Sequence, residues 1–128
     1  MGTRSLTFVY DENRPVINMY RQFDGYPSGH GQELAEFLLE GKMTNGIPVG
    51  SKEHFFNGMG CLAAQLVANF KKDSGGFYLY PLDVTDCWQE YEYHVYENKV
   101  VVKNPTEVIF EGSWNDFHSF CYADDMVE

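Results

Sequence analysis

The sequence predicts an α+β fold: an N-terminal β-hairpin, two helices, an antiparallel β-meander and a short C-terminal helix, in a single domain over residues 1–128. Three observations predict this class. Runs rich in β-branched and aromatic residues lie toward both ends of the chain. Apolar residues at helical spacing lie between them. A length of 128 residues with 44% hydrophobic residues suits one domain with a core and argues against a disordered chain.

The hairpin is predicted by residues 5–10 (SLTFVY) and 16–23 (VINMYRQF), which are joined by the turn-forming segment DENRP. Successive side chains of a strand point to opposite faces of the sheet. One face of the second strand then carries Ile17, Met19 and Arg21, and the other carries Asn18, Tyr20 and Gln22.

Two helices follow the hairpin. Residues 32–40 (QELAEFLLE) place Leu34, Phe37 and Leu38 on one stripe, and Gly41 is a suitable stop. After an irregular segment, 43–57, a longer stripe ends before Lys71 and Lys72, whose charges suit the negative end of a helix dipole. The members of that stripe are Met59, Leu62, Ala63, Leu66, Val67 and Phe70.

The rest of the chain predicts a meander with strands at 77–84, 88–96, 100–102 and 108–110. On the strand 88–96, Tyr91, Tyr93 and Val95 face one way, and Glu90, Glu92 and His94 form an acidic, wet side. Ser113 with Asp116 fits the acidic form of a capping box and starts the last helix. The apolar stripe of that helix is Trp114, Phe117 and Cys121.

The net charge of −10 is carried almost entirely by the second part of the chain. Residues 1–75 hold seven Lys and Arg against eight Asp and Glu, whereas residues 76–128 hold two against eleven. Direct binding of nucleic acid is not expected, because such proteins neutralise phosphates over a broad basic face. A local anion pocket in the balanced first part is still compatible with this charge.

The most unusual segment is residues 20–31 (YRQFDGYPSGHG), where a strand ends, a glycine-rich loop follows and a helix begins. Free N–H groups at a helix N-terminus favour an anion, and glycines let a ligand approach the backbone closely. Arginine can clamp a phosphate, and tyrosine can stack on a base. The predicted ligand-binding residues are Arg4, Tyr20, Arg21, Asp24, Gly25, Tyr26, Ser28, Gly29, His30 and Gly31.

The loop matches no named phosphate-binding pattern, neither GxxxxGK[ST] nor GxGxxG. Its composition also fits a plain connection, in which glycines adopt positive φ and Ser28 caps the following helix. Sequence alone leaves both interpretations open.

The opening MGTRSLT, the string YRQFDGYPSGHG and the following ELAEFL resemble a group of small uncharacterised proteins of tailed phages and bacteria. The resemblance implies a phage or bacterial origin and a place in the cytoplasm of a bacterial cell. Because the group has no assigned activity, it implies no functional residues.

We therefore expect a small cytoplasmic binding protein for an anionic small molecule, with a nucleotide as the favoured ligand, rather than an enzyme. In a phage such a protein could sequester a nucleotide signal of host defence. One alternative is a hydrolase acting on a phosphorylated nucleotide, with Ser28 and His30 as nucleophile and base and Asp24 as a base or metal ligand. The neighbours Glu53 and His54 are another acid–base candidate.

A second alternative is that the acidic half engages a basic partner protein, in the strong form as a mimic of DNA, although ordinary solubility charge explains the same residues. The acidic residues concerned are Glu90, Glu92, Glu97, Glu107, Glu111, Asp116, Asp124, Asp125 and Glu128.

No cofactor and no metal site is predicted. Cys61, Cys87 and Cys121 are widely spaced without a CxxC pair, which is typical of reduced thiols, although ligands distant in sequence can still converge on a metal. No apolar run approaches the roughly 20 residues of a membrane span, and no signal-peptide core is present, so no membrane partner is expected. The many aromatic residues leave a homo-oligomer open.

Overall fold

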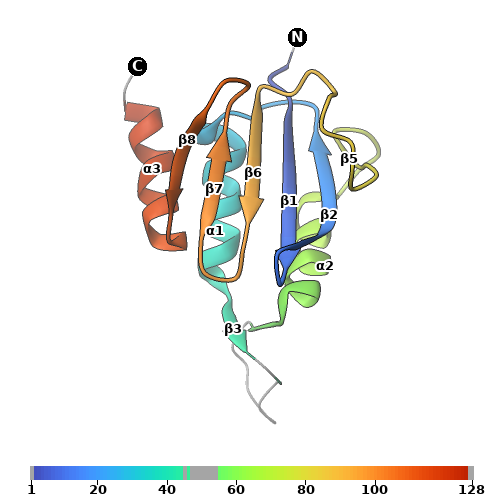
Figure 1. The fold of residues 1–128 in the computed structure, drawn as a ribbon, viewed down its shortest axis with the longest axis vertical. Coiled ribbons are helices and arrows are strands. Elements are labelled where there is room, and N and C mark those ends of the chain that lie inside the picture. The colour runs from blue at the N-terminus through green and yellow to red at the C-terminus, as the bar shows by residue number, and fades with distance from the viewer. Residues whose placement is uncertain (1, 45, 47–54, 127–128) are drawn as a thin grey trace.

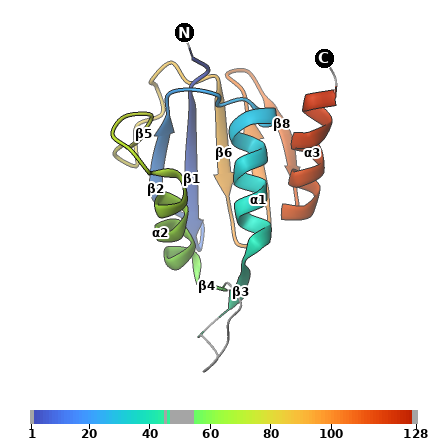
Figure 2. The ribbon, with the colours of Figure 1, turned by 180° about the vertical axis from the view of Figure 1, so that it is seen from behind.

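The computed structural model describes residues 2–44, 46 and 55–126, and these form the predicted α+β fold. A six-stranded sheet has helices packed on one face, and no helix of the described residues lies on the other face (Figures 1 and 2). The strands of this sheet are β1 (Ser5–Asp11), β2 (Arg14–Arg21), β5 (Phe77–Leu79), β6 (Tyr91–Val95), β7 (Val100–Lys103) and β8 (Val108–Gly112). The helices are α1 (Gln32–Glu40), α2 (Met59–Phe70) and α3 (Trp114–Met126), and a π-helical turn, η1 (Pro27–Gly31), leads into α1.

The strand order is β5-β2-β1-β6-β7-β8, and the pairing is antiparallel except between β1 and β6. In that parallel pair Ser5 lies opposite Tyr91 and Val9 opposite Val95. The N-terminal hairpin is therefore joined edge to edge with the C-terminal meander. This pairing brings residues from the two ends of the chain together in the middle of the sheet.

The core lies between the sheet and the helices. Each fully buried Leu, Val or Phe side chain stabilises the fold by about 1.5–3 kcal/mol relative to an exposed one. The sheet contributes Val9, Met19, Tyr93, Val95, Val100 and Val102, and the helices contribute Leu34, Phe37, Leu38, Leu62, Leu66 and Phe117, among others. A smaller cluster on the helix-free face consists of Leu6, Phe8 and Tyr20 under Tyr80 and Cys87.

The hairpin, both central helices and the C-terminal helix are confirmed. Glu12 and Asn13 form the hairpin turn with φ of 52° and 67°, the left-handed values that match the twist of paired strands. A Cβ at Gly41 would lie 2.5 Å from the Phe56 ring, so close approach explains the glycine that ends α1. Asp116 N–H donates to Ser113 Oγ at 3.1 Å, which is the predicted N-cap of α3.

The extent of the predicted meander is wrong at its start. Its first strand is only β5, and β5 pairs with β2 at the far edge of the sheet rather than with β6. Pro81 has no N–H to continue a ladder. Asn18 Nδ2 donates to the carbonyls of Pro81 and Val84 at 3.0 and 2.9 Å, which holds residues 81–84 over the helix-free face. The next strand also starts late, at Tyr91 rather than at Trp88.

The segment 43–57, predicted to be irregular, contributes two short strands. β3 (Lys42–Thr44) and β4 (Phe55–Asn57) form a parallel pair beside the main sheet. Glu53 and His54 lie outside the described residues. Within the described part of the chain, no helix combines the length and apolar character that crossing a bilayer requires.

Candidate functional site

The glycine-rich loop is bonded into the body of the protein. The N–H groups of Gly25 and His30 donate to the carbonyls of Thr3 and Asp24 at 2.8 and 2.7 Å, and those of Gly29 and Gly31 both donate to Tyr26 O, at 2.9 and 3.4 Å. These donors therefore do not point at an open anion site. Because α1 begins at Gln32 after η1, Ser28 is not its N-cap. The glycines at residues 25, 29 and 31 do not have positive φ, so these two predicted details of a plain connection are wrong.

His30, expected to be a ligand donor, is completely buried beside β1 and β2. Arg21 Nη1 donates to its Nδ1 at 3.2 Å, so Nε2 carries the hydrogen and donates to Thr7 Oγ1 at 2.7 Å. Burial, and then the charge of Arg21, lower the pKa of His30 to about 3. The imidazole is neutral near pH 7 and fills a structural position.

Arg21 is also fully engaged. Its guanidinium donates to Phe23 O at 2.6 Å and to both carboxylate oxygens of Glu33 at 3.1 and 3.3 Å. It also lies 4.9 Å from the centre of the Phe77 ring. A fork-shaped pair of this kind satisfies the guanidinium and fixes its direction.

Two of the remaining predicted residues, Arg4 and Tyr20, lie on the opposite side of the sheet from His30. Tyr20 lies on the helix-free face, stacked on Tyr80 with ring centres 4.9 Å apart. Burial raises the pKa of Tyr20, and Arg4 beside it partly offsets the rise. Asp24 is exposed and accepts from Tyr26 Oη at 3.3 Å. The sheet thus separates Arg4 and Tyr20 from Arg21 and His30, and the loop as an anion site stays a prediction.

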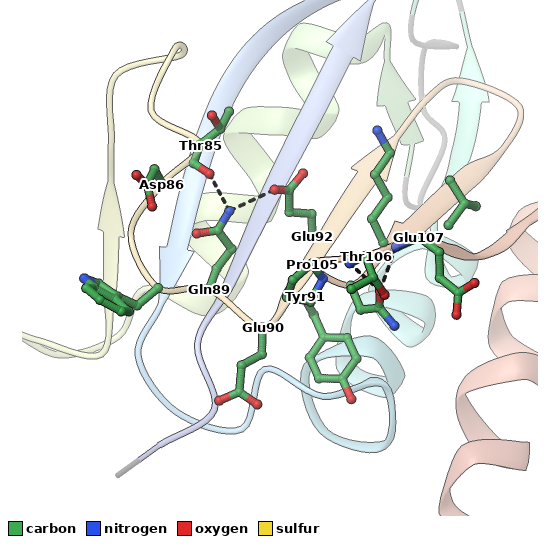
Figure 3. A pocket seen from close by; sticks show the side chains of 13 residues that line it. Thr85, Asp86, Gln89, Glu90, Tyr91, Glu92, Pro105, Thr106 and Glu107 are labelled. Atoms are coloured by element: carbon green, nitrogen blue, oxygen red, sulfur yellow. Dashed lines mark hydrogen bonds between the residues drawn. The ribbon is translucent and has the colours of Figure 1, made fainter.

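A second constellation lies on the helix-free face, where β1 meets β6. Tyr10 Oη lies 2.6 Å from His94 Nδ1, and His94 Nε2 lies 3.0 Å from Glu92 Oε1. Gln89 Nε2 donates to the other carboxylate oxygen of Glu92 at 2.8 Å and to Thr85 O at 2.7 Å. We call Tyr10, His94 and Glu92 the relay; Figure 3 shows Gln89 between Glu92 and Thr85.

Stacked rings hold the relay in place. Phe8 lies nearly parallel to the His94 ring, with centres 5.0 Å apart and 5° between the planes. Tyr96 covers Tyr10 in the same way, at 4.4 Å and 8°. His94 is buried, whereas Tyr10 is only partly so. The face predicted to be acidic and wet is therefore partly sealed at His94.

The environment shifts the pKa of both ends of the relay. The hydrogen bond from His94 is the largest cause that lowers the pKa of Glu92. Burial acts in the opposite direction, and the hydrogen bond from Gln89 lowers the pKa further. The net result is a lowered pKa, so the carboxylate is ionised near pH 7. Burial, and then Tyr96, raise the pKa of Tyr10 well above its usual range. Tyr10 is accordingly protonated and donates to His94 Nδ1, while Nε2–H donates to Glu92.

Glu92 also lines a hollow of about 560 Å³ at the end of the sheet, between residues 85–92 and the β7–β8 turn (Figure 3). Four carboxylates border it against one ammonium group: Asp86, Glu90, Glu92 and Glu107 against Lys103. Trp88 is 84% exposed at its border, with φ of 66°. A large side chain in left-handed backbone is uncommon and marks a site worth a functional hypothesis.

Only part of this site was visible in the sequence. The alternation of Glu90, Glu92 and His94 along one strand already places an acid and a base on one face. Tyr10 could not be added to them, because it lies 84 residues from His94 and meets it only through the parallel β1–β6 pairing. The sequence pattern predicts Trp88 inside a strand, whereas the strand begins at Tyr91 and the Trp88 side chain is exposed.

Comparisons with protein-family models, with curated proteins and with solved structures find no match. The resemblance to small phage and bacterial proteins therefore stays a prediction. The chain has an α+β fold, and the helix-free face of its sheet carries the relay and the acidic hollow.

Proposed function

We propose that the protein is a binding module, and that the hollow at residues 85–92 and 103–108 takes a cationic segment of a protein partner. The observation that carries this proposal is the border of the hollow: four carboxylates, one ammonium group and the exposed indole of Trp88. Carboxylates form strong charge-assisted hydrogen bonds with guanidinium and ammonium groups. An indole face adds a cation–π attraction of about 0.5–1 kcal/mol at an exposed site.

The charge of the chain supports a cation rather than an anion at this place. Residues 76–128 hold eleven acidic residues against two basic ones, and the hollow lies within this half. An anionic ligand there would meet the carboxylates of Glu90, Glu92 and Glu107 with Lys103 as the one cation of the lining. The proposal develops the expectation that the acidic half engages a basic partner.

Glu92 is the best-prepared of the four carboxylates. Its side chain is 23% exposed and is held by His94 on one oxygen and by Gln89 on the other. A group fixed in advance loses little conformational entropy when the ligand arrives. Glu92 therefore supplies a fixed charge at the inner end of the hollow, while Glu90 and Glu107 are exposed around it.

The nucleotide ligand predicted for the loop at residues 24–31 stays a separate prediction, as does hydrolysis of a phosphorylated nucleotide. Arg21 and His30 are the predicted contacts that bear on it most directly. Both are occupied within the fold by Glu33 and Thr7, so a nucleotide would have to displace existing hydrogen bonds.

Calorimetric titration with a short arginine-rich peptide tests the proposal, with a glutamate-rich peptide and a nucleotide panel as parallel probes. The double change Glu90→Gln and Glu107→Gln removes two charges from the hollow, and Glu12→Gln with Glu40→Gln removes two exposed charges elsewhere. At about 0.2–1 kcal/mol for each surface pair, we expect the first double variant to lose roughly two- to thirtyfold in affinity.

The matched double variant at residues 12 and 40 should bind the arginine-rich peptide nearly as the wild type does. Equal losses in the two double variants would mean that only overall charge attracts the peptide, and the proposal would fail. Tight binding of a nucleotide with no binding of the arginine-rich peptide would favour the loop instead.

A further inference from the structure

We propose that the relay makes Tyr10 a nucleophile that accepts an acyl group from an activated ester, with His94 as its general base and Glu92 as a positioning residue. This activity shares Glu92 with the proposed binding site but has its own nucleophile and base. It uses the Tyr10 and His94 side chains, which are not in the lining of the hollow.

The connectivity is that of a nucleophile, a base and a group that orients the base. The Tyr10 hydroxyl lies 2.6 Å from His94 Nδ1, and the opposite ring nitrogen lies 3.0 Å from Glu92 Oε1. In the neutral imidazole whose Nε2–H donates to the ionised carboxylate, the lone pair of His94 is on Nδ1 and faces the phenol. Hydrogen-bond distances on both sides of a base are the structural signature of an activated nucleophile.

The base is buried, whereas the nucleophile is partly exposed. His94 is buried beneath Phe8, which shields the base from water. Tyr10 is partly exposed and stacks on Tyr96, so its ring is fixed while a side of it faces solvent. A nucleophile and base already held in reacting geometry need little reorganisation in the transition state.

The base is required because the phenol is protonated near neutral pH. Tyr10 Oη attacks the ester carbonyl carbon, and its proton passes to His94 Nδ1 as the new C–O bond forms. The imidazolium, stabilised by Glu92, returns this proton to the departing alkoxide as the original C–O bond breaks. Water then attacks the acyl-tyrosine, with its proton passing through His94 to Tyr10 Oη. The net reaction is ester plus water giving acid plus alcohol.

The test uses p-nitrophenyl acetate and the full-length protein. We expect acetyl transfer to Tyr10 in preference to the exposed Tyr78, measured by peptide mass spectrometry and by release of p-nitrophenol. Tyr10→Phe should abolish this release above background, and Tyr78→Phe should leave it unchanged. His94→Gln should slow acetylation of Tyr10 by roughly 10²-fold or more, since general bases contribute about 10²–10⁴-fold.

Because His94 is buried, a second pair of variants keeps the test decisive if His94→Gln misfolds. Glu92→Gln should slow the acetylation of Tyr10, whereas Glu92→Asp, which keeps a carboxylate, should recover part of the rate. Equal labelling of Tyr10 and Tyr78, or an unchanged rate in both His94→Gln and Glu92→Gln, would overturn the proposal. Tyr10→Phe should still bind the arginine-rich peptide, so the activity and the binding function fail independently.

Discussion

At the scale of single residues, His30 illustrates why a side chain suited to a ligand can serve the core. In the sequence His30 lies between two glycines of the loop, which suggests a side chain that is free to bind a ligand. In the fold, β1 brings Thr7 to one ring nitrogen and β2 brings Arg21 to the other. Thr7 is 23 residues from His30 and Arg21 is nine residues from it, on the strand before the loop, so only the tertiary structure reveals that both ring nitrogens are used.

His30 should give stability a dependence on pH. Its pKa is about 3 in the folded protein against 6.5 without the fold, so the unfolded chain binds more protons between these values. The contribution of His30 to the free energy of unfolding is therefore fully present above about pH 6.5. It falls as the pH is lowered toward 3, with a slope of up to about 1.4 kcal/mol per pH unit. Urea unfolding of the wild type and of His30→Gln between pH 7.5 and 5 measures it.

We expect the His30→Gln variant to lose less stability than the wild type over this range, whatever its stability at pH 7.5. The matched change His118→Gln, at a half-buried position on α3, should keep the wild-type slope. Parallel wild-type and His30→Gln slopes would show that the burial of His30 does not set this dependence.

The Tyr93 hydroxyl anchors the loop to the core. Its hydroxyl donates to Gly25 O at 2.7 Å from a fully buried ring. Tyr93→Phe removes the donor and leaves a buried carbonyl without it, which costs about 1–3 kcal/mol. Thermal unfolding should show this loss, and hydrogen exchange should speed up at residues 25–31. A loop that exchanges as before would indicate that Tyr93 does not anchor it.

At the scale of elements, local signals predicted α3 better than they predicted the strands before it. A cap is a contact between residues three positions apart, so Ser113 and Asp116 predict it from the local sequence. The end of β5 depends instead on Asn18, which holds Pro81 and Val84 from another strand. That is why a strand predicted over residues 77–84 stops at Leu79.

The cap of α3 gives a prediction of its own. Ser113→Ala leaves the N–H of Asp116 without its acceptor, and loss of an N-cap costs about 0.5–2 kcal/mol. Denaturant unfolding should show a lower midpoint with an unchanged slope. Ser113→Asp keeps an acceptor at the cap and should stay near the wild type. A Ser113→Ala variant as stable as the wild type would mean that solvent replaces this bond without loss.

At the scale of the whole molecule, local pattern predicted most of the elements, whereas non-local pairing fixed their order. The β1–β2 hairpin follows from alternation and a short turn, and α1 follows from apolar spacing. No local signal specifies that β1 lies parallel to β6, or that β5 adds to the far edge beyond β2. The relay depends on that order, so it could not be predicted even though its residues were all in view.

The same order gives the molecule two unequal faces. Helices cover the face with Tyr93 and Val95, and the face with His94 and Glu92 is covered only in part, by residues 80–90 (Figures 1 and 2). The proposed binding site lies where this helix-free face meets the acidic second half of the chain. The loop at residues 24–31 is instead bonded to the rest of the fold through the backbone of Gly25 and His30 and through Tyr93.

Chemical-shift mapping of backbone amides during titration with the arginine-rich peptide tests most directly whether the hollow is the binding site. We predict changes concentrated at residues 85–92 and 103–108, reduced in the Glu90→Gln and Glu107→Gln variant. Changes concentrated at residues 25–31, or scattered over acidic residues at the opposite end of the sheet such as Glu12 and Glu40, would contradict it.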